Sequence, residues 1–357
     1  MENSITITMI FEGSALNRNE KIGGNILSIK KLNVNGIEKS YISKVAIRHY
    51  LFTTLINAYG WKEAQISNDR NVLQFDISKD DIISCEELDA FGYMNTNLGQ
   101  TRKSPLHITK AISISPYEQD MAMYANHDLT RRAKEQGTLD IEANPDPYNK
   151  EEHTSLYKIS FTVDGKKFGT DRWIVNGNVE FDKNKGELNL GQIRTINNAI
   201  KKDNKYLIKD NNNNEQGEIL VKKLENETYI VDFISNKRGE RIRQILNAIH
   251  NGLIAHSSGE SNTIVPLFLI AGEVKVPSPV FHSYIDVKRK EDGTFEVIGV
   301  NDALKNNWLE ENVYIFDTEK VHSQTIQSSK IIVTERNKFL ETINLNEDEN
   351  NNSNSGK

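Results

Sequence analysis

Apolar and polar residues alternate along several short stretches of the chain, which is the pattern of a β-strand with one buried face. The stretch from Ser4 to Phe11 alternates Ile and Met with Thr, and residues 155–163 alternate in the same way. Residues 72–77 and 106–114 predict two further strands. The continuous apolar run of residues 264–271 predicts a strand that is buried on both faces.

Two other stretches repeat their apolar residues at the spacing of a helix. Residues 44–59 follow Ser43, a favourable N-cap, and are stopped by Gly60, while residues 241–253 form the second helix. The two predicted apolar stripes consist of Ile47, Tyr50, Leu51, Leu55 and Ala58, and of Ile242, Ile245, Leu246, Ile249 and Leu253.

The order of these elements predicts an α+β fold with a βαββαβ core, a split βαβ or ferredoxin-like arrangement. We expect residues 1–163 and 237–300 to form this core, with inserted segments. Residues 164–236 are rich in Asn, Lys and Gly and predict an inserted, mainly β subdomain with a mobile loop. We expect residues 301–343 to extend the core and residues 344–357 to be disordered. Such a core, as the RNA-recognition fold, often binds single-stranded RNA.

The charge of the chain is unevenly distributed. The 357 residues carry a formal net charge of −6, but residues 13–50 hold seven Lys or Arg against two Glu. A basic loop that leads into a helix N-terminus favours phosphate binding. With no apolar segment long enough to span a membrane and no secretory signal pattern, we expect a soluble, cytoplasmic protein.

Candidate RNA-binding residues lie mainly in this basic stretch and in the loop that precedes residue 106. They are Asn17, Arg18, Asn25, Lys30, Lys31, Ser43, Lys44, Arg48, Arg102 and Lys103. Lys44 and Arg48 are four residues apart and therefore share one helix face. For Lys30, Lys31, Arg102 and Lys103, a solvated surface position is an equally good interpretation. We interpret Arg241 and Arg243 as surface charges with a possible phosphate contact, and Phe91 and Met94 as core residues rather than a base-stacking platform.

The sequence offers little for catalysis. Its eight His are scattered, without a metal-binding spacing, and no phosphate-binding Gly-rich loop is present. The single cysteine, Cys85, excludes an internal disulfide and a multi-cysteine zinc site, and its acidic neighbours Glu86 and Glu87 should raise the pKa of its thiol. We therefore expect a non-catalytic chain without a metal or cofactor.

Several segments together resemble a known family. They are Leu16-Asn-Arg-Asn-Glu20, Gly23-Gly24-Asn25, Lys30-Lys31, Tyr41-Ile-Ser-Lys-Val-Ala-Ile-Arg48, Asp89-Ala-Phe-Gly-Tyr-Met94, Thr101-Arg-Lys-Ser-Pro-Leu106 and Leu156-Tyr-Lys-Ile-Ser-Phe161. In this order they resemble the backbone subunit of the type I CRISPR interference complex, Cascade, in its DevR-type branch and subtype I-B.

The resemblance implies an RNA-recognition-like palm with inserted fingers and a thumb, and copies that stack as a helical filament along guide RNA. It carries over Asn17, Arg18, Ser43 and Arg48 as guide-RNA ligands. It places a thumb tip at residues 257–263, with Ser258, Gly259 and Asn262 as candidates. The implied partners are the guide RNA, target DNA paired to it, other copies of the chain, and the large, guide 5′-end-capping and guide-processing subunits of Cascade.

Two other functions remain open from the sequence. One is an RNA endonuclease on the same fold, which resembles the type III backbone subunits and would use Glu20 or Glu38 with a divalent metal. The other is a gene regulator that binds duplex DNA, although no recognition-helix pattern stands out.

Overall fold

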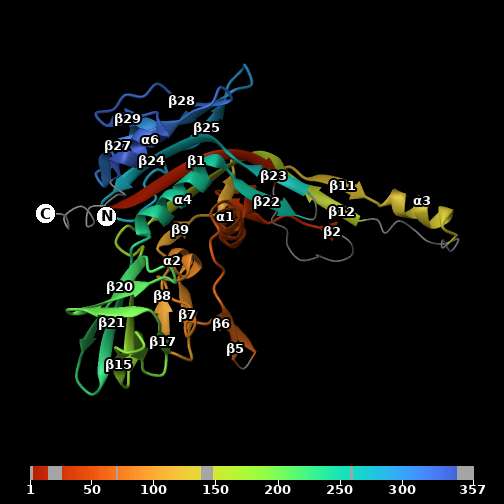
Figure 1. The fold of residues 1–357 in the computed structure, drawn as a ribbon. Helices are drawn as coiled ribbons and strands as arrows, with labels where there is room; N and C mark the ends of the chain where they lie inside the picture. Colours follow the sequence, from red (N-terminus) through yellow and green to blue (C-terminus); the bar gives the residue numbers. More distant parts are fainter. Residues whose placement is uncertain (1–2, 15–25, 70, 138–147, 258–259, 344–357) are drawn as a thin grey trace.

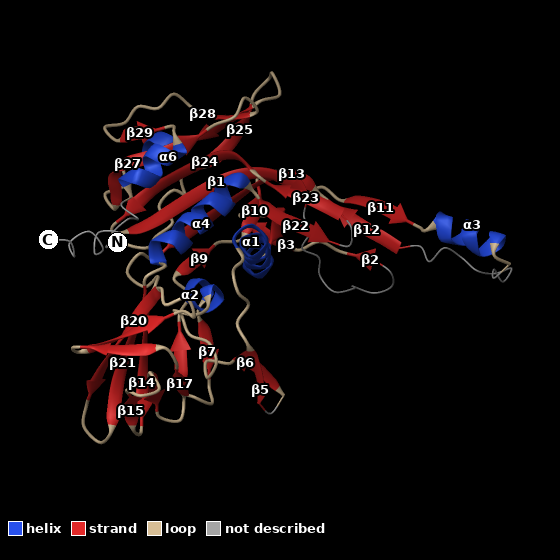
Figure 2. Ribbon diagram, in the orientation of Figure 1, coloured by secondary structure: helices blue, strands red, loops and turns tan. Residues whose placement is uncertain are grey.

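The computed structural model describes residues 3–14, 26–69, 71–137, 148–257 and 260–343. The fold is mixed α+β, as predicted, and is rich in strands with few helices. A large central sheet carries a second β-rich lobe on one side and a long projecting arm (Figures 1 and 2). Within the described residues, no helix has both the length and the apolar character that a membrane crossing requires.

Strands of the central sheet lie in the order β29-β27-β24-β1-β13-β10-β4-β3, and β9 also pairs with β13. Their bounds are β1 Ser4–Ser14, β3 Lys31–Val34, β4 Ile37–Ile42, β9 Leu106–Ile108, β10 Ala111–Ser113, β13 Thr154–Val163, β24 Pro266–Val274, β27 Leu309–Phe316 and β29 Ile331–Val333. β1 is antiparallel to both of its neighbours, β13 and β24. The strands predicted from Ser4, residue 155 and residue 264 therefore form the centre of the sheet.

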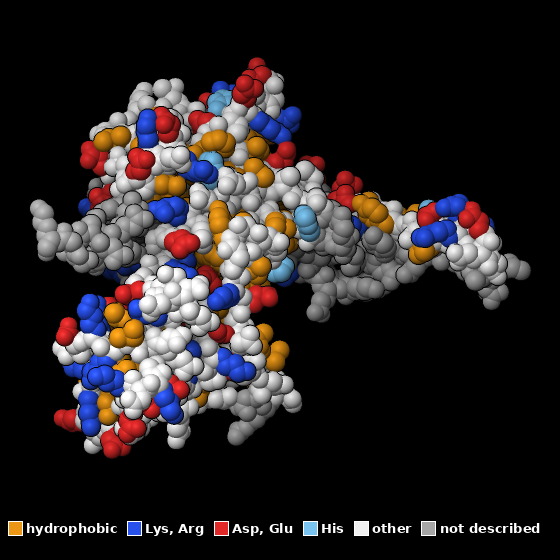
Figure 3. Space-filling model, viewed as in Figure 1, with side chains coloured by type: hydrophobic (Ala, Val, Ile, Leu, Met, Phe, Trp, Pro, Cys, Tyr) orange, Lys and Arg blue, Asp and Glu red, His pale blue; other side chains and the backbone are white. Residues whose placement is uncertain are grey.

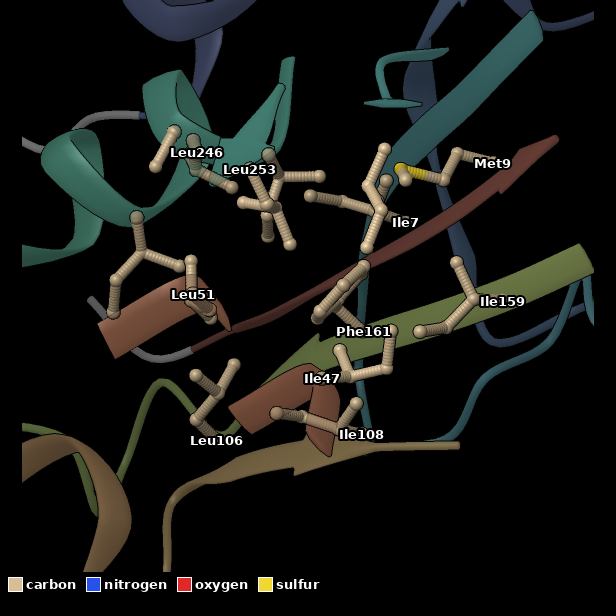
Figure 4. Packing of buried hydrophobic residues seen from close by; sticks show 14 of the residues in the cluster. Ile7, Met9, Ile47, Leu51, Leu106, Ile108, Ile159, Phe161, Leu246 and Leu253 are labelled. Carbon is tan, nitrogen blue, oxygen red and sulfur yellow. The ribbon is translucent and has the colours of Figure 1, made fainter. Parts of the chain in front are cut away.

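Two helices, α1 (Lys44–Tyr59) and α4 (Arg238–Asn251), pack on one face of this sheet. Figure 4 shows Leu51 of α1 and Leu246 of α4 among the sheet residues Ile7 and Phe161. Burying each such side chain contributes about 1.5–3 kcal/mol. Both predicted helices are confirmed, with two exceptions on their apolar stripes. Ala58 is exposed, and Leu253 lies beyond the end of α4, in a strand.

The strand predicted over residues 106–114 is divided into β9 and β10. Ile108 pairs with Phe161, and Ile112 pairs with Lys158. The two paired positions are therefore four residues apart on the β9–β10 segment but three residues apart on β13. This extra residue is a β-bulge, which re-aims the side chains that follow it. As a result, Leu106 and Ile108 face the helices, and so does Ala111 after the bulge.

Half of the opposite sheet face is covered by the C-terminal part of the chain. β25 (Asp286–Arg289), β26 (Phe295–Ile298), β28 (Val321–Ser323) and α5 (Val300–Ala303) pack there on Ile10, Phe268 and Ile270. The helix α6 (Arg336–Thr342) contributes Phe339 to the core on the other face. Thr8 of β1 and Ser160 of β13, which lie on this same face, are fully buried.

The second lobe combines the segment before β9 with the segment between β13 and α4. It contains a five-stranded sheet, a three-stranded sheet, two hairpins and one helix: β14 Thr170–Asn176, β15 Val179–Asp182, β16 Glu187–Leu190, β17 Arg194–Ile196, β18 Ala199–Lys202, β19 Lys205–Lys209, β20 Glu215–Lys223, β21 Thr228–Ser235, β5 Ile66–Asp69, β6 Val72–Phe75, β7 Tyr93–Asn95, β8 Gln100–Arg102 and α2 Glu86–Phe91. Its core joins Trp173 and Phe233 to Ile82 and Leu88, so residues 164–236 share a core with the earlier segment.

The arm consists of β11 (Asp120–Tyr124), α3 (His127–Glu135) and β12 (Tyr148–Glu152), with β2 (Ile26–Leu27) added at its base. It extends away from the central sheet (Figure 1). None of the residues of α3 is buried. A shorter hairpin, β22 (Leu253–Ser257) and β23 (Glu260–Ile264), lies beside β1.

Candidate nucleic-acid interface

The first turn of α1 has an unusual charge. Ser43 caps the helix, with its hydroxyl accepting a hydrogen bond from the N–H of Ala46 at 3.3 Å. No acidic residue occupies the first turn, where Lys44 is exposed and Arg48 follows one turn later. A helix N-terminus already carries partial positive charge, so added cations are unfavourable there unless an anion binds. This arrangement favours phosphate as a ligand.

Arg48 is held in place by two contacts with α2. Its Nη2 donates to Oε1 of Glu87 at 3.1 Å, and its guanidinium carbon lies 4.7 Å from the ring centroid of Phe91. The Arg48 side chain nevertheless keeps an exposed fraction of 35 %. Glu87 also accepts from the N–H of Ala64, but burial outweighs both partners and raises the pKa of Glu87. Arg48 is therefore anchored while part of its guanidinium remains accessible.

Beside Arg48 a groove of about 940 Å³ runs between α1 and residues 62–75. His49 and Lys62 line it together with Arg48, and so do the acids Glu63 and Asp80. The surface around it is mixed: Figure 3 shows Lys and Arg interspersed with acids over the second lobe, not a uniformly acidic face. Among the lining groups, Arg48 and Lys62 are the cations that can attract a phosphate.

Lys31, by contrast, belongs to an internal ion pair. Its Nζ lies 3.3 Å from both carboxylate oxygens of Glu151 and 4.3 Å from the ring centroid of Tyr117. Burial opposes the charge of Lys31, yet the hydrogen bond and attraction of Glu151 raise its pKa. The preceding Lys30 is half-buried on the same segment. Lys31 therefore fixes the base of the arm, and it is not kept in the RNA-binding surface proposed below.

A pH-dependent stability follows from this pair. Burial opposes the charge of Glu151, but hydrogen bonds from Ser28, Ile29 and Lys31 lower its pKa. We expect Glu151→Gln to reduce the free energy of unfolding at neutral pH by about 1–3 kcal/mol. The carboxylate's contribution is present above the unfolded pKa of about 4.3 and is lost as pH falls through the lower folded pKa.

Urea unfolding of the wild type and the variant, at neutral pH and in acid, measures this effect. The difference between the two proteins should shrink in acid. Glu335→Gln, which removes an exposed acid paired with Lys338, is the control and should change little. A difference that grew on acidification would contradict the assignment.

Arg102 is buried, with an exposed side-chain fraction of 5 %. Its five N–H donors are satisfied by the carbonyls of Thr170, Leu88, Asp89 and Lys167 and by the Asp89 carboxylate. No donor is left for a phosphate, so Arg102 has a structural role. Lys103 is exposed and lines a separate groove of about 610 Å³ with Lys167 and Arg172. The structure does not bring Lys103 into the groove beside α1.

Our interpretation of Arg241 as a surface charge is wrong, because the residue is 1 % exposed. It donates to the carbonyls of Ile82 and Ile83 and to Asp89, with Nη1 and Oδ2 2.8 Å apart. Asp89 therefore holds two buried arginines, Arg102 and Arg241. The sequence missed this because Arg241 borders the apolar stripe and its partner lies 152 positions away.

The segment Asp89–Met94 has a structural explanation. Phe91 is a core residue, as predicted, but Met94 is 65 % exposed, so its assignment to the core is wrong. Gly92 adopts a φ of 68°, and a Cβ there would lie 2.3 Å from the carbonyl oxygen of Arg102. Tyr93 donates to Asp171 at 2.7 Å. The segment thus fixes α2, and through Phe91 it supports Arg48.

Of the remaining candidates, Asn262 lies near the end of β1. Asn17, Arg18, Asn25, Ser258 and Gly259 are outside the described residues. The Asn262 side chain accepts from the N–H of Ser14 at 3.1 Å and donates to the carbonyl of Ser14. Asn262 therefore ties the β22–β23 hairpin to the strand that leads into the basic loop. This contact is structural, and it sets where the chain leaves the sheet toward residue 15.

The arm is a feature that the sequence reasoning missed. It exposes Met121, Met123 and Leu129 by 41 %, 73 % and 54 %. A helix of nine residues without buried side chains is marginal by itself, so the arm is expected to gain stability from a partner. The alternation of Met121 and Met123 was a weak strand signal. Arg131 and Arg132 are exposed and pair with Asp128.

Within the described ranges, no group of three or more His, Cys, Asp or Glu is placed to hold a metal ion. Glu38 is exposed on β4, and Glu20 lies outside those ranges. Cys85 is buried, and this burial is the main reason that the pKa of its thiol rises to about 12. The direction of that shift agrees with the sequence-based expectation, although burial outweighs the acidic neighbours.

Comparisons with known proteins give a family and a fold. The sequence model of the family described as "CRISPR-associated negative auto-regulator DevR/Csa2" matches residues 5–293. A solved structure described as "CRISPR RNA-guided surveillance complex, pre-nicking" is 8% identical, with a TM-score of 0.50 over 95% of this chain and 98% of that chain. A second, "CRISPR RNA-guided surveillance complex", has the same identity and coverage and a TM-score of 0.49. No curated protein sequence matches the chain.

Proposed function

The chain belongs to the CRISPR-associated DevR/Csa2 family, and from this premise we propose that it is a non-catalytic backbone subunit of a type I Cascade complex, of subtype I-B. In this role, copies of the chain line up along guide RNA and hold its sugar-phosphate chain. The bases are then free to pair with target DNA, so that pairing, not the protein, reads sequence.

The strand order supports an RNA-recognition-like palm. β24, β1, β13 and β10 are neighbours, and each pair of neighbours is antiparallel. Helix α1 follows β1 in the chain, and α4 precedes β24. This order agrees with the βαββαβ plan of the split βαβ fold. The second lobe then corresponds to fingers, and the projecting arm is a better candidate for the thumb than the β22–β23 hairpin.

The single observation that carries the proposal is the acid-free, cationic first turn of α1 beside an open groove. We propose that Lys44 and Arg48 bind phosphates there, with Ser43 fixing the helix end. Lys30, Asn25 and, by family resemblance, Asn17 and Arg18 are the further candidates for this surface. The usual RNA platform of the fold is closed in its middle, because Thr8 and Ser160 of the central strands are fully buried.

What co-purifies with the chain tests the proposal. We expect the protein expressed with its neighbouring CRISPR components to carry a short RNA of defined length and to elute with other Cascade subunits. Because the family description names an auto-regulator, duplex DNA is the second ligand to examine. Recovery of duplex DNA in place of RNA, or of a nucleic-acid-free chain, would contradict the backbone role.

We also expect the purified complex to leave complementary RNA intact in the presence of Mg²⁺. Cleavage of the type III kind needs an acidic residue that holds a metal at the target strand. Denaturing gel electrophoresis of end-labelled target RNA measures this directly. Cuts at regular spacing would refute the non-catalytic assignment, and their loss in Glu38→Gln would identify the residue responsible.

A further inference from the structure

The sheet face opposite α1 and α4 is only half covered. Its β24 and β1 side is closed by the C-terminal elements, with Ile10 and Ile270 in their core. The covered half ends near Ser160, whose hydroxyl lies 2.8 Å from Nδ1 of His282. On β10 and β4, beyond this border, side chains of the same face remain accessible. We call this accessible part of the sheet face the open half.

Four side chains of the open half are brought together by strand register. Tyr41 of β4 pairs with Ile112 of β10, which in turn pairs with Lys158 of β13. Ser40 and Ile42, on either side of Tyr41, are fully buried toward the helices, so Tyr41 faces the opposite way. The bulge between β9 and β10 places Lys110 on this same face, with its Nζ 5.1 Å from the centroid of the Tyr41 ring.

Lys39 is a further cation near Tyr41, whereas Lys158 lies on the other side of Ile112. Lys39 lies two residues before Tyr41 on β4 and donates to the carbonyl of Ile114 at 2.9 Å. Lys158 donates to the carbonyl of Ile285 at 2.7 Å. Asp286 is an acid that interacts electrostatically with the Lys158 ammonium. The group formed by Tyr41, Lys39, Lys110 and Ile112, which we call the Tyr41 platform, therefore combines a ring, an apolar floor and cations.

We propose that the Tyr41 platform is a second binding site for single-stranded nucleic acid, in which one base stacks on Tyr41 and Lys110 and Lys39 contact the flanking phosphates. An exposed cation–π contact contributes about 0.5–1 kcal/mol, whereas base stacking on an aromatic side chain contributes about 1–3 kcal/mol per base. A base therefore displaces the Lys110 ammonium from the ring. The released ammonium then reaches the neighbouring phosphate.

This site is distinct from the surface at α1, because α1 packs on the other face of the sheet. The two surfaces meet at one end of β4, where Ile42 is followed by Ser43 and α1. The inference goes beyond the proposed backbone role. It requires only that a single strand, RNA or DNA, binds a face that the α1 groove does not use.

The test uses the full chain and single-stranded oligonucleotides of about 12 residues, one oligo(U) RNA and one oligo(dT) DNA. Fluorescence anisotropy is measured for the wild type, Tyr41→Ala, Tyr41→Phe and Lys110→Ala. The same set is repeated in the Lys44→Ala, Arg48→Ala background, where binding at α1 is weakened. A photoreactive 5-bromouracil in each strand is cross-linked to the wild type, in which trypsin cuts after Lys39, Lys44 and Arg48 and separates residues 40–44 from residues 45–48.

We expect Tyr41→Ala to weaken binding of at least one strand about tenfold in both backgrounds, whereas Tyr41→Phe binds like the wild type. The cross-link should fall in the peptide of residues 40–44. The oligonucleotide whose binding is weakened, oligo(U) or oligo(dT), identifies RNA or DNA as the ligand. A persistent Tyr41→Ala effect with no effect of the α1 substitutions would reject the α1 surface but keep the platform.

Equal affinities of wild type and Tyr41→Ala for both strands would overturn the inference. So would equal losses in Tyr41→Ala and Tyr41→Phe, because a stacking role needs the ring and not the hydroxyl. Thermal unfolding of each variant is recorded with the binding data. If Tyr41→Ala unfolds at a much lower temperature than the wild type, the cross-link position in the wild type and the effect of Lys110→Ala on binding decide the outcome.

Discussion

The double substitution Lys44→Ala, Arg48→Ala should weaken binding of single-stranded RNA about tenfold at moderate salt and flatten its salt dependence. For single strands, log Kobs falls with log salt by about 0.7 per phosphate contact, so the loss of two contacts should reduce the slope by about 1.4. The physical reason is the geometry at α1. Both cations lie on one helix face, close to an N-terminus whose first turn has no acidic residue to balance their charge.

Titrations between about 50 and 300 mM salt measure this slope. Lys305→Ala, Lys338→Ala is the matched control, because it removes the same charge from exposed positions that pair with local acids on other helices. Arg48→Ala also leaves Glu87 without its cation, so thermal unfolding is recorded in parallel. An unchanged slope in a folded double variant would remove the α1 surface from the proposal.

The elements that could be predicted from the sequence are those specified locally. α1 was predicted with its observed bounds because its cap, its apolar stripe and its terminal Gly60 are all within one short segment. β1 and β13 were predicted because alternation persists over many residues. The division of residues 106–114 was missed, because a bulge depends on the register of the partner strand and not on the strand's own composition.

The candidate site was predicted less completely, for a related reason. Lys31, Arg102 and Arg48 look alike in the sequence, as cations near loops or on a helix face. Their roles separate only when the fold brings Glu151, Asp89 and Glu87 to them from 120, 13 and 39 positions away. Whether a cation remains available to phosphate is thus a property of tertiary contacts, which no local pattern encodes.

Asp89→Asn should be among the most destabilising single substitutions in the chain, with a loss of about 3–5 kcal/mol in the free energy of unfolding. Asp89 is fully buried, and its Oδ1 accepts from Arg102 at 2.9 Å and from the N–H of Gly169 at 2.8 Å. Its Oδ2 accepts from Arg241 at 2.8 Å. One carboxylate therefore joins α2, β8, the start of β14 and α4.

The amide keeps the size of the carboxylate but removes its charge and turns one acceptor into a donor that faces an arginine. Two buried guanidinium groups then lose the carboxylate they share and keep only longer contacts, Arg241 with Glu86 at 3.4 Å and Arg102 with Asp171 at 3.9 Å. Losing the partner of a buried charge costs more than the pairs themselves contribute. Urea unfolding gives the loss as a shift of the midpoint at constant slope. Asp302→Asn, at an exposed ion pair on α5, should change stability by less than about 0.5 kcal/mol.

The same experiment separates a structural from an RNA-binding role for Arg102. Replacing the three buried charges together, as Asp89→Leu, Arg102→Met and Arg241→Met, removes both guanidinium groups with the carboxylate they share and should recover part of the stability lost in Asp89→Asn. If this folded triple variant binds RNA like the wild type, Arg102 contributes no phosphate contact, as its satisfied donors imply. A stable triple variant with a reduced salt slope would instead return Arg102 to the binding surface.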